Sequence, residues 1–141
     1  MTTMDFKLEV IVVPVSDIDR ARAFYADQCG FNVDVDNAPT PEFRNVQLTP
    51  PGSGCSIVIG KGVAAMAPGS LKGLQLCVAN IDAAHALYTE RGVPVSVIRH
   101  HDGSGFVDGK GGDWNSFFFF DDPDGNSWAV QESPTVRAAA A

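Results

Sequence analysis

The side chains that bind metals or carry protons are few and widely separated in this sequence. His100 and His101 are adjacent near the expected end of a strand, so their side chains point to opposite faces and cannot bind one ion together. One of them can face a site and accept a proton near neutral pH; the alternative is a solvated loop histidine. Cys29, Cys55 and Cys77 form no C-x-x-C pair, which indicates reduced thiols. The sequence therefore assigns no catalytic residue.

Motifs for phosphate binding and for nucleophilic catalysis are also missing. The glycines of residues 103–112 do not connect a strand to a helix, so they do not form a phosphate-binding loop. The G-x-S-x-G motif of serine hydrolases is absent. Residues 102–113 are polar and glycine-rich, which predicts a long loop that can cover a site.

The charge of the chain narrows the class of partner. The 141 residues carry a formal net charge of −7, with a pI of about 4.7. This balance argues against binding nucleic acid or an anionic membrane surface, since both require a basic face. The sequence has no apolar run of about 20 residues, and its start does not have the pattern of a signal peptide. We expect a cytoplasmic protein that binds neither nucleic acid nor membrane.

An internal repeat organises the chain. Residues 15–25 and 78–88 align with an offset of 63 and share six of eleven residues, among them Ile18 with Ile81 and Tyr25 with Tyr88. A repeat of this kind indicates two copies of one structural module.

Each copy predicts a strand, a helix and three further strands. Ser16 or Asp17 can cap the first helix and Asn80 the second, while Gly30 and Gly92 can end them. The expected strands are residues 8–15, 31–36, 43–49 and 55–60 in the first copy, and 73–79, 95–100, 115–121 and 127–132 in the second.

These elements predict one domain of the α+β class over residues 1–141. Module one spans about residues 6–62 and module two about 72–133. Residues 63–71 form the linker between them, and residues 134–141 form a tail.

Three features together resemble one known superfamily. They are the Val-Ser-Asp-Ile-Asp-Arg-Ala-Arg-Ala-Phe-Tyr run at 15–25, the Gly-Phe that follows it, and the Phe-x-Asp-x-Pro-Asp-Gly-Asn segment at 119–126. Combined with the repeat, they resemble the vicinal oxygen chelate superfamily, which includes glyoxalase I, bleomycin resistance proteins and extradiol dioxygenases. The resemblance implies two βαβββ modules that form a cupped, incomplete mixed β-barrel, with helices outside and a small molecule inside. It also implies a homodimer.

The resemblance implies a metal site whose ligands this chain does not carry. In metal-dependent members, the ligands come from the first and last strands of both modules. Those positions fall here on Val10, Gly73, Ala129 and the strand at 55–59. None of these side chains is an imidazole or carboxylate, which a divalent cation needs. A one-residue slip in two strands would bring in Glu9 and Glu132, but no histidine. We predict no metal and no other cofactor.

The cup should instead be lined by apolar walls and a few amides. Phe117 and Phe119 face it if the turn at 122–125 carries a glycine bulge, whereas a simple two-residue turn would reverse that choice. The glutamines either orient a ligand or bond each other and water. The predicted ligand-binding residues are Val10, Val12, Gln47, Gln75, Cys77, His100, Trp114, Phe117, Phe119, Ala129 and Gln131.

Three functions are compatible with these features. The first is binding of a small organic molecule without metal, as in bleomycin resistance. The second is a metal-dependent or cofactor-free lyase, isomerase or dioxygenase of the glyoxalase type. The third is a regulatory or interaction role with a filled cup.

Overall fold

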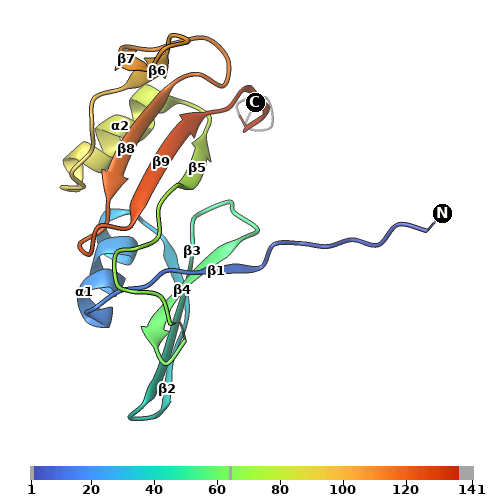
Figure 1. Ribbon diagram of the computed structural model, residues 1–141, viewed down its shortest axis with the longest axis vertical. Helices are drawn as coiled ribbons and strands as arrows, with labels where there is room; N and C mark the ends of the chain where they lie inside the picture. The colour runs from blue at the N-terminus through green and yellow to red at the C-terminus, as the bar shows by residue number, and fades with distance from the viewer. Residues whose placement is uncertain (1, 64, 137–141) are drawn as a thin grey trace.

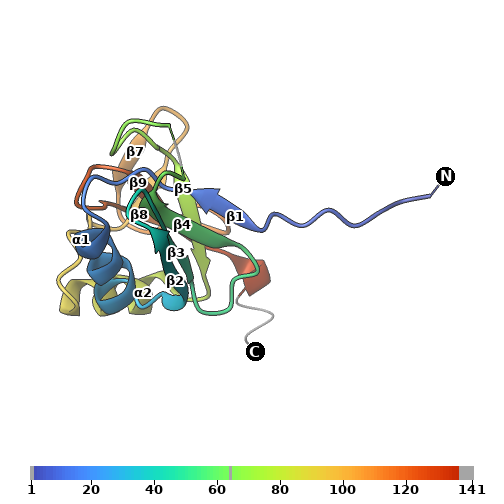
Figure 2. The same ribbon diagram turned by 90° about the horizontal axis from the view of Figure 1, so that it is seen from below.

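The chain forms two β-sheets along the long axis of the molecule, and its helices gather on one side (Figures 1 and 2). The computed structural model describes residues 2–63 and 65–136. The strand order is β1-β4-β3-β2 in one sheet and β5-β9-β8-β6-β7 in the other. In the described residues the sheets do not close into a barrel. The expected α+β fold with two cupped sheets is confirmed.

Both sheets begin with the same parallel pairing, in which the first strand of a module lies beside its last. β1 pairs with β4, and β5 pairs with β9.

No helix in the described part of the chain is long and apolar enough to cross a membrane. The strands are β1 (Val10–Val12), β2 (Asn32–Thr40), β3 (Phe43–Thr49), β4 (Ser56–Lys61), β5 (Leu74–Val78), β6 (Arg99–His101), β7 (Phe106–Asp108), β8 (Phe117–Asp121) and β9 (Ser127–Glu132); the helices are α1 (Ile18–Ala23), the π-helix η1 (Phe24–Gln28) and α2 (Ile81–Glu90).

The two long helical segments begin at equivalent caps. Asp17 accepts a hydrogen bond from the Arg20 N–H at 3.0 Å, and Asn80 accepts one from the Ala83 N–H at 3.0 Å. Each cap satisfies a backbone donor that has no partner within the helix. Of the two residues that the sequence offered for the first cap, Asp17 takes the role, and the Ser16 hydroxyl donates instead to Asp124.

A single core joins the two modules. The ring of Trp128 on β9 lies 5.7 Å from that of Tyr25 and 5.8 Å from that of Phe31, centroid to centroid. Phe24 and Phe120 add a further edge-to-face contact at 6.1 Å. All five residues are buried. Because these rings come from both halves of the chain, the modules share apolar burial rather than folding as independent units.

A buried polar network lies within this core. The Tyr25 hydroxyl donates to Asp122 at 2.7 Å and accepts from the Trp128 indole at 3.0 Å. Burial, followed by the nearby Asp122 carboxylate, raises the pKa of Tyr25 far above its ordinary value. Tyr25 therefore remains a neutral donor to Asp122.

Asn126 ties three separate segments to this network. Its side chain is fully buried and donates to the Pro14 carbonyl and to Asp122, both at 2.8 Å. Its Oδ1 accepts the Leu71 N–H at 3.0 Å. The amide thus links the segment after β1, the end of the linker and the β8–β9 turn.

Four predicted segments differ clearly from the structure. The strand expected at 8–15 is limited to Val10–Val12, the residues whose register is shared with β4. The strand expected at 31–36 extends to Thr40, and the one expected at 95–100 is shorter and shifted, at Arg99–His101. The loop expected at 102–113 contains β7, which pairs with β6. That short hairpin brings an unexpected phenylalanine, Phe106, to the site described below.

Candidate functional site

One face of the second sheet carries most of the residues predicted to contact a ligand. Paired positions across β5, β9 and β8 form two rows, Gln75–Ala129–Phe119 and Cys77–Gln131–Phe117. Residues paired across adjacent strands project to the same side of a sheet. We call these six residues and Phe106 the aromatic face.

The orientation of the phenylalanine strand is decided by its neighbours. Phe118 and Phe120 are buried, and both contact the ring of Tyr88 on α2 edge to face. Phe117 and Phe119 therefore project away from the helices. This is the orientation that the sequence predicted for a turn at 122–125 with a glycine bulge.

The rings of the aromatic face form an open platform. Phe117 and Phe119 are stacked with centroids 6.2 Å apart and planes 6° from parallel. Phe106 meets them edge-on at 5.5 and 5.2 Å, and 48% of its surface is exposed. Aromatic rings left accessible in this way offer both apolar area and stacking geometry to a flat guest.

The amides beside this platform are already bonded to each other. Gln75 Nε2 donates to Gln131 Oε1 at 2.7 Å, and Gln131 Nε2 donates to the Trp114 carbonyl at 2.7 Å. The Cys77 thiol lies 3.8 Å from the same Gln131 oxygen. The sequence left two alternatives for the glutamines, to orient a ligand or to bond each other and water. The geometry matches bonding to each other, and these hydrogen bonds fix the position of Gln131.

Trp114 stands at the rim of the aromatic face in an unusual conformation. Its φ of +62° is the one positive value among the described residues other than glycine, and its side chain is 48% exposed. A tryptophan in this region is strained, and the Gln131 bond to its carbonyl helps to hold it there.

Val10, Val12 and Gln47 lie apart from the aromatic face, in the first sheet. Val12 and Gln47 are both paired with Val58 and share one row, and Val10 is paired with Ser56. These residues form a second, aliphatic face. Ten of the eleven predicted residues are thus divided between the two sheets of one chain, and Trp114 lies in the loop before β8.

His100 lies on the opposite side of its strand from Phe117. Arg99 is paired with Phe117, so His101, two residues further on, shares the side of the aromatic face. His101 contacts Phe106 edge-on at 5.3 Å, whereas His100 Nδ1 lies 3.0 Å from the Gly109 carbonyl oxygen. His101, rather than the predicted His100, is the histidine at this face. The pairing of Arg99, rather than His100, with Phe117 explains the difference, and the sequence alone does not fix that register.

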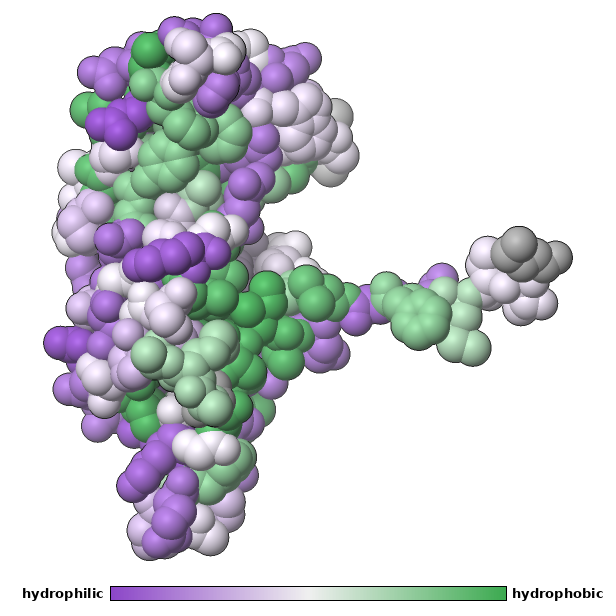
Figure 3. All heavy atoms as spheres, viewed as in Figure 1, coloured by the Kyte–Doolittle hydropathy of each residue, from purple (hydrophilic) through white to green (hydrophobic). Residues whose placement is uncertain are grey.

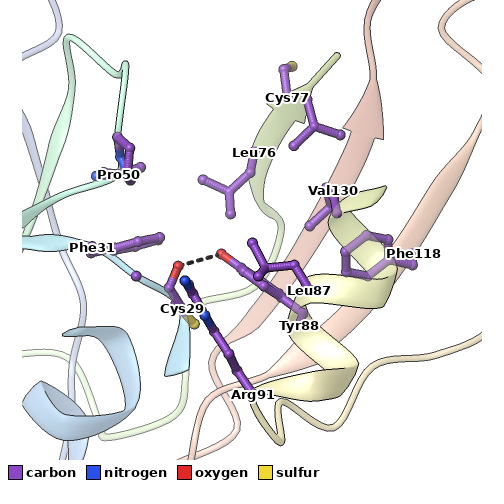
Figure 4. A pocket seen from close by; sticks show the side chains of 14 residues that line it. Cys29, Phe31, Pro50, Leu76, Cys77, Leu87, Tyr88, Arg91, Phe118 and Val130 are labelled. Carbon is purple, nitrogen blue, oxygen red and sulfur yellow. Dashed lines mark hydrogen bonds between the residues drawn. The ribbon is translucent and has the colours of Figure 1, made fainter. Parts of the chain in front are cut away.

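A separate pocket lies between the two modules (Figure 4). It has a volume of about 320 Å³, near the lower limit for small-molecule sites. Its wall is mostly apolar, and the Tyr88 hydroxyl donates to the Cys29 carbonyl at 3.1 Å beside it. We call it the inter-module pocket; its side chains are those of Cys29, Phe31, Pro50, Pro51, Leu76, Cys77, Val78, Ala84, Leu87, Tyr88, Arg91, Phe118 and Val130, with Gly30 completing the wall.

The whole-chain comparisons agree with this architecture. The family model of the Glyoxalase/Bleomycin resistance protein/Dioxygenase superfamily matches residues 7–130. The chain belongs to this superfamily.

Solved structures include clear relatives within the superfamily. TnmS3, an antibiotic binding protein from Streptomyces sp. CB03234, is 33% identical, with a TM-score of 0.74 over 94% of this chain and 99% of that one. A glyoxalase/bleomycin resistance protein from the same organism is 35% identical, with a TM-score of 0.69 over 89% and 99%. A superfamily member from Sphaerobacter thermophilus DSM 20745 is 28% identical, with a TM-score of 0.72 over 93% and 100%. No curated protein matches the chain.

The positions that hold metal in glyoxalase-type members do not fit a cation here. Ala129 lies within the aromatic face, Gly73 precedes β5, and Val10 has only a hydrocarbon side chain. Glu132 accepts the Ile81 N–H at 2.9 Å and is thereby directed toward the start of α2. In residues 2–63 and 65–136, no group of three or more His, Cys, Asp or Glu side chains could hold a metal ion. This donor set lacks the nitrogen and oxygen ligands that a divalent cation requires.

The most buried and the most exposed of the three thiols should differ sharply in reactivity. Cys29 is buried, and that burial raises its pKa to about 12, so at pH 8 it remains a protonated, unreactive thiol. Cys77 is exposed. In a native-state titration with Ellman's reagent at pH 8, we expect Cys77 to react within minutes and Cys29 to react only after urea is added. Rapid modification of Cys29 in the folded protein, located by peptide mass mapping, would contradict this expectation.

Proposed function

We propose that the protein binds a flat, largely apolar organic molecule on the aromatic face and sequesters it inside the cell. The observation that carries the proposal is the accessible platform of Phe106, Phe117 and Phe119. Exposure of three aromatic rings to water on one face of a sheet is unfavourable in free energy, and a ligand or a partner that covers them removes this penalty. The net charge of −7 favours a neutral or cationic guest.

The similarity to TnmS3 supports this proposal. That protein is described as an antibiotic binding protein, and its match extends over 94% of this chain. Because both chains share the whole cupped architecture, a binding role is a better analogy than an activity taken from more distant members. A bound antibiotic or similar secondary metabolite is the proposed ligand class.

A homodimer is part of the same proposal. The aromatic face and the aliphatic face of Val10, Val12 and Gln47 belong to different sheets of one chain. A twofold-related copy can place the aliphatic face of one chain over the aromatic face of the other and enclose the ligand from two sides. The exposed surfaces of Trp114 and Phe106 then become part of a closed cup.

Binding is proposed to need no metal, because shape and stacking hold the guest. Glyoxalase-type catalysis uses a metal to polarise substrate oxygens, and the side chains at the corresponding positions supply no ligands for one. The His101 ring accepts the Gly103 N–H at 3.1 Å, and within the described residues no hydrogen bond joins it to a carboxylate or a second imidazole that could take part in acid-base chemistry. The enzymatic alternative is therefore not favoured.

Fluorescence titration with acridine orange, a flat cationic dye, tests the binding proposal. We expect saturable binding with one dye per chain, unchanged by EDTA, in protein that elemental analysis shows to hold less than stoichiometric metal.

Native mass spectrometry of protein purified without chelator would report retained ligand and subunit number together. One tightly held divalent ion per chain, whose removal abolishes binding, would favour the enzymatic alternative. Failure of acridine orange and of a wider set of flat aromatic compounds to bind would reject the proposal.

A further inference from the structure

The inter-module pocket lies on the opposite side of the second sheet from the platform of phenylalanine rings. In the view of Figure 3, the molecule is hollowed between its two halves. The pocket lies between the same halves, with residues 29–31 and 50–51 of module one facing β5, α2, β8 and β9 of module two. Phe118 and Val130, which are paired across β8 and β9, line it from the helix side of the sheet. Cys77, on the edge strand β5, belongs to both the pocket and the aromatic face.

The charge at this pocket is opposite to that of the whole chain. The formal net charge is −7, yet the described residues that line the pocket include Arg91 and no Asp or Glu. Burial raises the pKa of Cys29 to about 12 and also raises the pKa of Tyr88, so both groups are neutral near pH 7. The guanidinium of Arg91 therefore gives the lining of the pocket a positive charge.

Arg91 is held at the edge of the pocket by the end of α2. It is the C-cap residue of that helix, and its carbonyl accepts a hydrogen bond from Gln28 Nε2 at 3.3 Å. Its side chain extends toward the hydrogen bond between Tyr88 and Cys29 (Figure 4). A Cβ atom on Gly30 would lie 2.5 Å from Nη1, so the glycine leaves the space that the guanidinium occupies.

This guanidinium is available to a ligand. Arg91 is exposed, and within residues 2–63 and 65–136 no carboxylate forms an ion pair with it. A guanidinium can bind a carboxylate through two parallel hydrogen bonds, and an arginine remains charged throughout the physiological pH range. The edge of the pocket can therefore bind an anionic head group.

The wall of the pocket has the complementary chemistry for an apolar body. Phe31, Leu76, Phe118 and Val130 contribute only hydrocarbon to it. A hydrocarbon group that covers these side chains is itself removed from water, which favours binding. The volume of about 320 Å³ admits only a small body.

We propose that the inter-module pocket is a second binding site, which takes a monocarboxylate with a small hydrocarbon body. The hydrocarbon lies against the apolar wall, and the carboxylate is paired with Arg91. This site favours an anion, whereas the aromatic face of the proposed function favours a neutral or cationic guest. It requires neither the aromatic face nor a dimer.

Isothermal titration calorimetry with sodium decanoate, kept below the concentration at which it forms micelles, tests the charged part of this site. We expect the wild-type protein to bind one decanoate per chain. Arg91→Gln should weaken binding roughly 10-fold, because the charge-assisted pair with the carboxylate is lost. Arg22→Gln is the matched control, since it removes the same charge from another exposed arginine, which lies outside the pocket. It should leave the decanoate affinity unchanged.

A pair of alanine substitutions on α2 tests the cavity itself. Ala84 lines the pocket, whereas Ala86 is exposed on the same helix. Ala84→Leu should abolish saturable decanoate binding, because the larger side chain fills part of the cavity, and Ala86→Leu should not change it. Circular dichroism verifies that each variant is folded. If Ala84→Leu does not fold, the comparison of Arg91→Gln with Arg22→Gln still decides the proposal, since both residues are exposed.

The possible outcomes separate this site from the proposed function. Decanoate binding that is equal in Arg91→Gln and wild type, or that is lost in Phe117→Ala and kept in Ala84→Leu, would overturn the second site. Failure of decanoate to bind a protein that still binds acridine orange would overturn the second site alone. If Ala84→Leu then also changed the sedimentation coefficient, a second copy of the chain would be the occupant of the pocket. Decanoate binding as expected, in a protein that binds no flat aromatic compound, would reject the proposed function and leave the second site standing.

Discussion

Replacing Asn126 with alanine is expected to lower the free energy of unfolding by about 3 to 5 kcal/mol, because three partners of a fully buried amide lose their hydrogen bonds at once. The partners are the Pro14 carbonyl, the Leu71 N–H and the Asp122 carboxylate. The site is fully buried, so water cannot replace the amide without a rearrangement. Chemical denaturation followed by circular dichroism measures the change.

The effect should exceed that of a similar amide on the surface. Asn115 also makes two side-chain hydrogen bonds, accepting from the His101 N–H at 2.8 Å and donating to its carbonyl at 2.9 Å. It is only half-buried, so water can substitute, and Asn115→Ala should cost about 1 kcal/mol. Equal losses in the two variants would show that Asn126 does not connect the modules in the way described.

Local chemistry made much of the fold predictable from the sequence. The caps at Asp17 and Asn80 are short-range features, because the cap and its partner lie three residues apart. The repeat placed both helices and the strand at 127–132 correctly, since each module must bury the same apolar stripe. Family resemblance then supplied the relation of the two sheets, which no local signal contains.

The composition of the site was less predictable because it depends on register and on pairing. Phe106 lies in a glycine-rich stretch where nothing indicates a strand, and β7 exists only because β6 offers it a partner. The same register decides between His100 and His101. The inter-module pocket draws on residues from four regions of the chain, 29–31, 50–51, 76–91 and 118–130, so no spacing pattern could reveal it.

The largest expected effect on function comes from the aromatic face. Phe117→Ala or Phe119→Ala should each weaken acridine orange binding roughly 30- to 100-fold, because each removes a buried stacking surface from the complex. Both rings are only half-buried in the free protein, so the folded state should survive either change. Fluorescence titration gives the affinity, and circular dichroism verifies the fold.

The intervening residue provides the matched control for this prediction. Phe118 has the same side chain and lies on the same strand, but it is fully buried against Tyr88 on the helix side. Phe118→Leu should lower the free energy of unfolding by about 1 to 2 kcal/mol and leave the dye affinity unchanged. If instead Phe118→Leu weakened binding as much as Phe117→Ala, the ligand would lie on the helix side of the sheet. The inter-module pocket, which Phe118 lines, would then replace the aromatic face as the binding site.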